Sequence, residues 1–224
     1  HTGKPNRRAY LFYGPPGTGK STLIQVIASK YNKHLCMLNF GGLTDTMLSK
    51  AIKSIRKNSI LILEDIDCLF TERNANDINK NYVTFSTLLN CLDGISSKEG
   101  LIVIMTTNYK DRLDEALIRP GRIDKMIEFG SIQKEPLEKM FIRCIFCSED
   151  MEGGIKLTDD ETRKEIFNAF YKEFKKLNMN DVTSCLMHQY LCNYIDEPEN
   201  VIKNIQEIKT SFQDTKKENK NMYM

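Results

Sequence analysis

The sequence predicts an α/β domain built on a parallel sheet, followed by a small all-helical domain. In the first part of the chain, short apolar runs alternate with helical patterns, which is typical of parallel strands joined by helices. The runs are continuously apolar, as strands buried on both faces of a sheet require. After about Ile132 only helical patterns follow. We therefore expect an α/β domain at residues 1–132, a helical lid domain at 133–210 and a flexible polar tail at 211–224.

The apolar runs and helical patterns place the individual elements. Strands are expected at residues 9–13, 35–40, 60–63, 101–106 and 126–129. Helices of the second domain are expected at residues 135–147, 159–177, 182–193 and 197–209. Thr158 and Glu161 form a capping box for the second of these helices, and Pro198 suits the first turn of the last. The lysine-rich end of the chain is expected to fray.

The composition is that of a soluble globular protein. Of 224 residues, 41% are hydrophobic and 28% are charged, and the net charge is only +2. A nucleic-acid-binding surface normally needs a clear excess of Lys and Arg, so we expect no nucleic-acid partner. No stretch reaches the ~18 apolar residues needed to cross a bilayer. Because the chain starts at His1, we expect it to be part of a longer protein, with any membrane segment outside this sequence.

The cysteines point to a reducing compartment. There are seven, an odd number, with no secretory signal before them. Cys144 and Cys147 form a C-x-x-C pair that, with Cys185 and His188, could hold zinc. Both pairs also lie in helical patterns, where a three-residue spacing places side chains on one buried face. We therefore favour cysteines buried in the core over a metal site.

The stretch GPPGTGKS, residues 14–21, lies between the first expected strand and a helical pattern. It satisfies G-x-x-x-x-G-K-[ST], in which glycines let backbone N–H groups surround phosphate oxygens and the following helix directs its positive end at the same anion. Lys20 would reach the β and γ phosphates of ATP, and Ser21 would ligate Mg²⁺. The alternative is a tight glycine turn with a solvated lysine. The expected ATP-binding residues are Gly14, Pro15, Pro16, Gly17, Thr18, Gly19, Lys20, Ser21 and Thr22.

Two adjacent acids, Glu64 and Asp65, follow the apolar run at residues 60–63. Such a pair can divide the work of hydrolysis, because one acid can hold Mg²⁺ while the other orients and deprotonates the attacking water. Asp67 follows two residues later. The alternative is an acidic loop with no catalytic role, which the preceding phosphate loop makes less favourable.

Two further polar features lie later in the first domain. Asn108 directly follows the apolar run at residues 102–107 and could position water or the γ phosphate. Arg119 and Arg122 flank a rigid Pro-Gly turn in LIRPGRID and suit contact with transferring phosphate from a neighbouring subunit. Structural ion pairs with Asp114 or Asp124 remain the alternative, which can hold for one of the two arginines.

Together, GPPGTGKS, the apolar strand with EDID, TTN and LDEALIRPGRID resemble the P-loop, Walker B, sensor 1 and second region of homology of the AAA ATPases. The four motifs occur in order and at suitable spacing. Longer stretches, among them RRAYLFYGPPGTGKS and TFSTLLNCLDGISSKEG, are similar to the AAA chaperones of the mitochondrial inner membrane that carry the folded Rieske iron–sulfur protein across that membrane during complex III assembly.

This resemblance implies a homo-oligomeric ring, heptameric in the full-length protein, with ATP and Mg²⁺ bound between neighbours. It implies a folded protein cargo such as the Rieske protein, and a place at the mitochondrial inner membrane with the ATPase domain facing the matrix. Residue by residue, it implies that Lys20 and Ser21 bind phosphate and Mg²⁺, Glu64 is the metal-side acid, Asp65 the general base, Asn108 sensor 1, and Arg119 and Arg122 the arginine fingers. The Glu-Asp order reverses the order common in the family, which leaves the division of roles between the two acids open.

Three functions are compatible with these motifs. The favoured one is an ATP-hydrolysing translocase or assembly chaperone. A nucleotide-switched scaffold with little hydrolysis is the first alternative, and a protein-threading unfoldase is the second. Threading motors carry an aromatic, an apolar residue and a glycine on a loop after the second strand. Here Phe40 and Gly41 match only in part, and we expect Phe40 to end a strand in the core.

Overall fold

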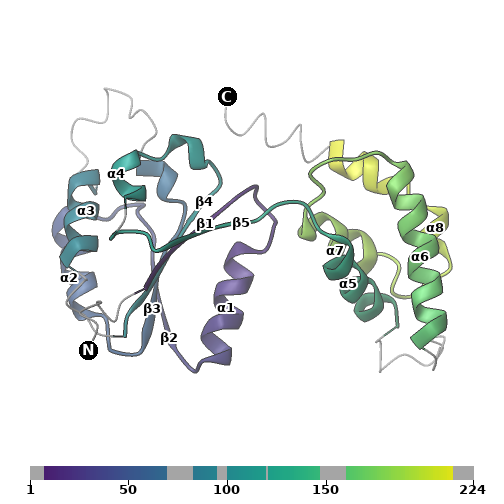
Figure 1. Cartoon of the computed structure of the whole chain (residues 1–224), viewed down its shortest axis with the longest axis horizontal. Helices are drawn as coiled ribbons and strands as arrows, with labels where there is room; N and C mark the ends of the chain where they lie inside the picture. Colours follow the sequence, from purple (N-terminus) through teal and green to yellow (C-terminus); the bar gives the residue numbers. More distant parts are fainter. Residues whose placement is uncertain (1–7, 70–82, 95–99, 120, 147–159, 214–224) are drawn as a thin grey trace. The chain divides into compact units, whose positions relative to one another are not determined.

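The computed structural model of the chain describes residues 8–69, 83–94, 100–119, 121–146 and 160–213 (Figure 1). The chain divides into two compact units, His1–Phe129 and Gly130–Met224. Each unit has its own hydrophobic core.

A five-stranded parallel sheet forms the centre of the first unit, in the order β2-β3-β4-β1-β5. In register, Tyr10 lies opposite Ile104 on one side and Lys125 on the other. The predicted α/β class with a parallel sheet is therefore confirmed. The strands are β1 (Arg8–Tyr13), β2 (His34–Leu38), β3 (Ser59–Leu63), β4 (Ile102–Thr107) and β5 (Lys125–Glu128).

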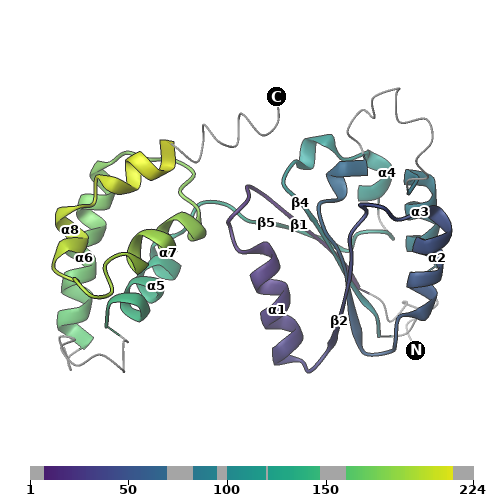
Figure 2. The same cartoon turned by 180° about the vertical axis from the view of Figure 1, so that it is seen from behind.

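Helices lie on both faces of this sheet. One face is covered by α1, and the opposite face by α2 and α3 (Figures 1 and 2). Short helical turns follow the ends of β3 and β4. The helices of this unit are α1 (Lys20–Lys30), η1 (Ile66–Leu69), α2 (Asp45–Ser54), α3 (Phe85–Gly94), η3 (Lys110–Arg112) and α4 (Glu115–Ile118).

Alternation of side chains along β3 explains why both faces are covered. All five residues of this strand are buried. Ile60 and Ile62 pack with Ile24 of α1, whereas Leu61 and Leu63 pack in the core beneath α2 and α3. Successive residues of a strand point to opposite faces, so the run of four apolar residues from Ile60 to Leu63 needs apolar cover on both sides.

The two edge strands differ from the sequence prediction. The prediction that the apolar strands are buried on both faces is wrong for β2, in which Leu35 is 42% and Met37 is 55% exposed. In β5, Met126 is 39% exposed. Each of these strands has a neighbour on only one side, and the covering helices protect the centre of the sheet more fully than its edges.

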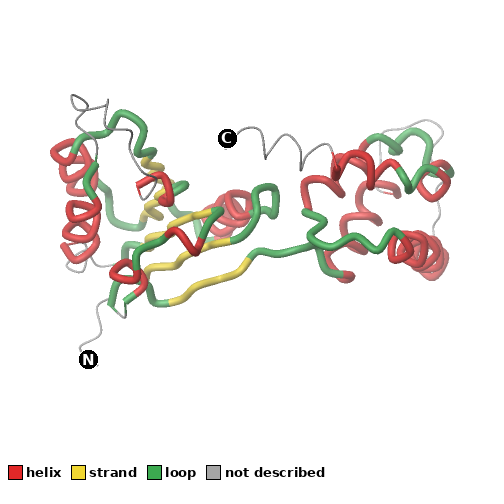
Figure 3. Tube along the Cα trace, turned by 90° about the horizontal axis from the view of Figure 1, so that it is seen from above, coloured by secondary structure: helices red, strands yellow, loops and turns green. Residues whose placement is uncertain are grey.

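The described residues of the second unit form helices and loops without a strand (Figure 3). Its core is rich in aromatic rings: Phe141 lies with its ring centre 4.8 Å from that of Phe170 and 5.6 Å from that of Phe167. Thr183 caps α7 by accepting a hydrogen bond from the backbone N–H of Leu186. The helices are α5 (Lys134–Phe146), α6 (Asp160–Lys176), α7 (Ser184–Cys192) and α8 (Asn200–Lys203).

The end of this unit departs from the single helix expected at residues 197–209. α8 begins at Asn200 with Glu199 as its N-cap, so Pro198 lies before the helix and not in its first turn. A turn at residues 204–206 separates α8 from a further helical segment at 207–213. Thr158 of the predicted capping box and residues 214–224 of the predicted tail lie outside the described residues.

No helix within the described ranges is both long enough and apolar enough to cross a bilayer.

Candidate active site

The predicted site residues come together at the carboxyl ends of three strands. Residues 14–19 join β1 to α1, Glu64 and Asp65 follow β3, and Asn108 follows β4. Because β4 lies between β1 and β3, Asn108 stands between the glycine loop and the two acids. Parallel α/β folds place their ligand sites at this edge of the sheet.

The glycine loop has a backbone conformation that side chains disfavour. Gly14, Gly17 and Gly19 have φ angles of +138°, +75° and +93°. A Cβ atom on Gly14 would lie 1.9 Å from the carbonyl oxygen of Phe129. The hydroxyl of Thr18 donates to the carbonyl of Pro15 at 2.8 Å and closes the loop. The loop therefore requires glycine for both its turn and its close approach to the end of β5.

Lys20 lies inside the loop and is only 7% exposed. Its ammonium group donates to the carbonyls of Gly14 and Pro15 at 2.7 and 2.9 Å and to Oδ1 of Asn108 at 2.8 Å. Burial lowers the pKa of Lys20, and the nearby charges of Asp65 and Asp67 act in the opposite direction. The ammonium group is thus held at the centre of the loop, where a phosphate would meet it.

Ser21 and Glu64 bring oxygen atoms from two elements to one point. The hydroxyl of Ser21, in the first turn of α1, donates to Oε1 of Glu64 at 2.9 Å. Hydroxyl and carboxylate oxygens are ligands that Mg²⁺ prefers. The pair fits the Mg²⁺ site predicted from the sequence.

Asp65 lies beside Glu64 with a φ of +48°. Its backbone N–H donates to the hydroxyl of Thr106 at 3.2 Å, and its carboxylate accepts from Nδ2 of Asn108 at 3.3 Å. Loss of surrounding water raises the pKa of Asp65, and the charges of Asp67 and Glu64 raise it further, while Lys20 acts against them. The carboxylate is therefore a stronger base than an ordinary aspartate.

Beneath these residues, Asp67 forms a buried link to β4. Thr107 donates its hydroxyl proton to Oδ1 of Asp67 at 2.6 Å, and the same hydroxyl accepts from the backbone N–H of Tyr109 at 3.0 Å. Thr107 is fully buried and Asp67 is 9% exposed. This link fixes the backbone on both sides of Asn108 and so orients its amide.

The loop, the acids and Asn108 surround a pocket of about 300 Å³, the lower end of the usual range for ligand sites. Gly14, Pro15 and Thr18, also predicted to bind ATP, are not among the described residues that line this pocket; their hydrogen bonds lie within the loop and with Lys20. The lining residues are Pro16, Gly17, Gly19, Lys20, Ser21, Thr22, Glu64, Asp65, Thr106 and Asn108.

The two arginines are not among the described residues that line this pocket. Arg122 binds Asp93 of α3 through two hydrogen bonds, from Nε at 3.0 Å and from Nη2 at 2.8 Å, and also donates to the carbonyl of Ala116 at 2.7 Å. The carboxylate of Asp93 raises the pKa of Arg122. Arg119 ends α4 and is exposed.

The ion-pair alternative therefore applies to Arg122, with a partner that the sequence did not suggest. Of the partners expected from the sequence, Asp114 caps α4 by accepting from the N–H of Ala116, and Asp124 accepts from the N–H of Ala9. Both carboxylates thus accept hydrogen bonds from backbone N–H groups. Asp93 lies 29 residues from Arg122 in the chain, a separation that local patterns do not reveal.

Sequence reasoning also missed Thr106 and gave no role to Asp67. Thr106 lines the pocket and accepts from the backbone of Asp65. The available signal was the pair of hydroxyl residues at the end of an otherwise apolar strand, next to the strand that ends in the acids. Hydroxyls buried at such a position need partners, and the nearest are the groups that follow the adjacent strand.

Comparison with known proteins identifies the family of this chain. The model of the ATPase family associated with various cellular activities (AAA) matches residues 10–131. A probable mitochondrial chaperone bcs1 of Schizosaccharomyces pombe is 40% identical over 157 residues, which cover 68% of this chain and 35% of that protein. The mitochondrial chaperone BCS1 of Homo sapiens is 42% identical over 149 residues, covering 63% and 36%.

A longer match includes the second unit. The probable mitochondrial chaperone BCS1-A of Dictyostelium discoideum is 34% identical over 215 residues, which cover 92% of this chain and 47% of that protein. The chain thus spans less than half the length of each of these relatives. Because the AAA model covers more than half of the chain, this protein belongs to the AAA family of ATPases, and within that family it is similar to the mitochondrial chaperones named BCS1.

Proposed function

We propose that this chain is the ATP-hydrolysing part of a ring-forming mitochondrial chaperone that drives the translocation or assembly of a folded protein cargo. The hydrogen bond of 2.9 Å between Ser21 and Glu64 carries the proposal. It joins a hydroxyl of the phosphate loop to a carboxylate at the end of β3, the two protein oxygens that a Mg²⁺–nucleotide site uses.

Lys20 and the loop would bind the phosphates of ATP. The ammonium group already occupies the centre of the loop, and its three acceptors there are two carbonyls and the Asn108 amide. Ser21 and Glu64 would hold Mg²⁺, which neutralises phosphate charge when it is bound. Backbone N–H groups of residues 17–19 of the loop and of Lys20, the first residue of α1, would complete the cradle.

Asp65 would accept the proton of the attacking water, and Asn108 would position that water. The pair is joined at 3.3 Å between Nδ2 and Oδ1. The raised pKa of Asp65 makes its carboxylate a better proton acceptor than an ordinary aspartate. Glu64 is engaged by Ser21, which supports the division of roles in which Glu64 serves the metal and Asp65 the water.

The relatives support the cellular part of the proposal, because their names describe mitochondrial chaperones. Together with the resemblance of the sequence motifs described above, this leads us to propose a homo-oligomeric ring, heptameric in the full-length protein, at the mitochondrial inner membrane with the ATPase domain in the matrix and the Rieske protein as cargo. Phe40 is 4% exposed and packs in the core of the first unit. A buried ring cannot grip a threaded chain, which speaks against the unfoldase alternative.

Phosphate release measured against protein concentration tests the ATPase proposal. A specific activity that climbs with concentration, and that is lost in Lys20→Ala, is the expected result for an enzyme active only in an assembly. Tight ATP binding without phosphate release, in a sample shown by its mass to be assembled with an ATP analogue, would favour the scaffold alternative. A constant specific activity in a sample whose mass shows a monomer would contradict the ring.

A further inference from the structure

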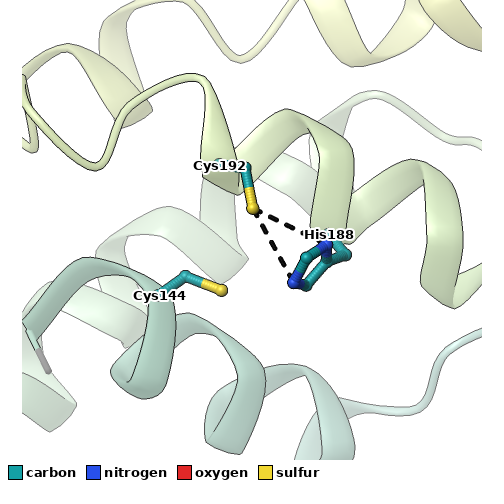
Figure 4. A group of neighbouring side chains, drawn as sticks. All are labelled: Cys144, His188 and Cys192. Atoms are coloured by element: carbon teal, nitrogen blue, oxygen red, sulfur yellow. Dashed lines mark hydrogen bonds between the residues drawn. The ribbon is translucent and has the colours of Figure 1, made fainter. Parts of the chain in front are cut away.

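Three potential metal ligands meet in the second unit. Cys144 belongs to α5, while His188 and Cys192 belong to α7 (Figure 4). The ligand atoms of the three side chains all lie within 4.8 Å of one another. Figure 4 shows both sulfur atoms and the imidazole directed at the same space between the two helices.

The spacing of residues on α7 brings two of the three ligands together. His188 and Cys192 are four residues apart, so they lie on the same face of the helix, one turn apart. Sγ of Cys192 lies 3.6 Å from Nδ1 and 3.7 Å from Nε2 of His188. Two ligands at this spacing are a common way for a helix to bind one metal ion.

These separations match those of a zinc site. Zn–S bonds of about 2.3 Å and Zn–N bonds of about 2.1 Å place the S and N ligands of a tetrahedral ion about 3.6 Å apart. The distances between Cys192 and His188 are already of this size. Sγ of Cys144 lies within 4.8 Å of the ligand atoms of His188 and Cys192. A small rotation of the Cys144 side chain would therefore bring all three ligands to zinc-binding distance.

Charge is also compatible with a divalent ion. Cys144 is half-buried, and a bare divalent charge there would be costly. Two thiolates balance the charge of Zn²⁺, so the complex is neutral and needs no further counter-ion. Zn²⁺ binding would convert both thiols to thiolates and release their protons to solvent.

We propose that Cys144, His188 and Cys192 form a Zn²⁺ site, with a water molecule in the fourth coordination position, that ties α5 to α7. The two helices already pack against each other, and the metal would add a bridge between them. This inference is independent of the proposed ATPase activity, because it rests on residues of the second unit alone.

Cobalt titration of the chemically reduced chain tests the proposal. Co²⁺ in place of Zn²⁺ should give an intense visible spectrum of a tetrahedral ion and a near-ultraviolet band from thiolate ligands, saturating at one ion per chain and abolished by added Zn²⁺. Any Co²⁺ at Ser21 and Glu64 would have oxygen ligands and no thiolate band. The readout therefore separates the two sites.

Variants assign the ligands. Loss of a group that merely orients a metal ligand costs about 10- to 100-fold in affinity, so Cys144→Ser, Cys192→Ser and His188→Asn should each weaken binding by at least about 100-fold. Cys185→Ser is the matched control, because Cys185 is exposed on the same helix and lies outside the cluster. It should keep the spectrum of the unaltered chain.

His188→Asn distinguishes loss of a metal ligand from unfolding of the chain. His188 is exposed, so this change should leave the circular dichroism spectrum intact while the cobalt spectrum is lost. Zn²⁺ should also raise the Tm of the unaltered chain, reversibly with a chelator, and leave the Tm of His188→Asn unchanged. Absence of a thiolate band in the reduced chain, or an unchanged band in Cys144→Ser, Cys192→Ser or His188→Asn, would overturn the proposal.

Discussion

Asn108 connects the two halves of the candidate active site through the two ends of one amide. Its oxygen accepts from Lys20 at 2.8 Å, and its nitrogen donates to Asp65 at 3.3 Å. An aspartate would lack the donor and a leucine would lack both groups. A phosphate placed on Lys20 would therefore be coupled through Asn108 to the orientation of the proposed base.

Lys20→Ala should weaken ATP binding about 10- to 100-fold, because a hydrogen-bonded charge contributes about 1.5–3 kcal/mol. Isothermal titration with an ATP analogue measures the loss. Lys30→Ala is the control, since Lys30 lies at the exposed far end of the same helix. Equal affinities for both variants would remove Lys20 from the site.

Asp65→Asn should keep ATP binding and lower the rate of hydrolysis about 10²- to 10⁴-fold, the usual contribution of a general base. Binding by titration and turnover by phosphate release separate the two effects. Asp111→Asn changes an exposed acid of η3 and should leave both unchanged. Unaltered turnover in Asp65→Asn would refute the assignment of the base.

The raised pKa of Asp65 also predicts a pH-dependent stability. The folded state binds a proton at this carboxyl more tightly than the unfolded state, so the charged form destabilises the fold at neutral and higher pH. Asp65→Asn should therefore have a higher Tm than the unaltered chain at pH 7–8. This advantage should shrink as the pH falls through the pKa of folded Asp65, and a constant difference would contradict the cause given for the shift.

At the level of single residues, the sequence identified the side chains that line the pocket better than the side chains that hold them in position. Lys20, Ser21, Glu64, Asp65 and Asn108 line one pocket because each follows the end of a strand. The support from Thr107 and Asp67 depends on register between β3 and β4, which no local pattern specifies.

The cysteines illustrate the same limit. The expected burial of Cys185 is wrong, since this side chain is exposed, while Cys147 lies outside the described residues. A three-residue spacing and a four-residue spacing both place side chains on one helix face. Only the packing of α5 against α7 selects Cys192 as the partner of His188 and Cys144.

Among the elements, the phosphate loop has a backbone conformation that requires glycine at its first residue. Gly14→Ala should lower the free energy of unfolding by at least about 1–3 kcal/mol, because its φ is disfavoured and its Cβ would overlap the carbonyl of Phe129. Thermal unfolding measures the loss, and ATP binding should weaken with it. Gly130→Ala is the control, since a Cβ there meets nothing within 4 Å. Equal Tm values for the two variants would contradict the tight contact.

Strands and helices were predictable where apolar patterns have clear ends. β3 and β4 each begin within a residue of the expected position, because polar residues flank their apolar runs. The break at residues 204–206 was missed, since that stretch keeps a helical pattern on both sides of the turn. Exposure of β2 was also missed, because its composition matches that of a central strand and only the strand order makes it an edge.

For the whole molecule, substitutions of Arg119 and Arg122 should have different effects, although the family resemblance implies that both are arginine fingers. Arg119→Ala should lower ATP hydrolysis about 10³-fold or more, with an unchanged Tm, because its side chain is exposed. Arg122→Ala should also lower the free energy of unfolding by about 1 kcal/mol through loss of its contacts with Asp93 and Ala116.

Asp93→Asn separates the two roles of Arg122. It should reproduce the stability loss and leave hydrolysis intact if the arginine acts on phosphate in a neighbouring subunit. Mixing each inactive arginine variant with Lys20→Ala should restore activity, since one supplies the pocket and the other the finger. Failure of every mixture, with both proteins shown to co-assemble, would assign Arg119 and Arg122 structural roles only.

The contact between Gly14 and Phe129 has a mechanical consequence for the whole chain. Phe129 is the last residue of the first unit, and Gly130 begins the second. The first residue of the phosphate loop therefore touches the backbone at the point where the chain leaves the sheet, with no side chain between them to absorb movement. A loop that shifts when phosphate enters or leaves would therefore move the backbone of Phe129, the residue directly before the second unit.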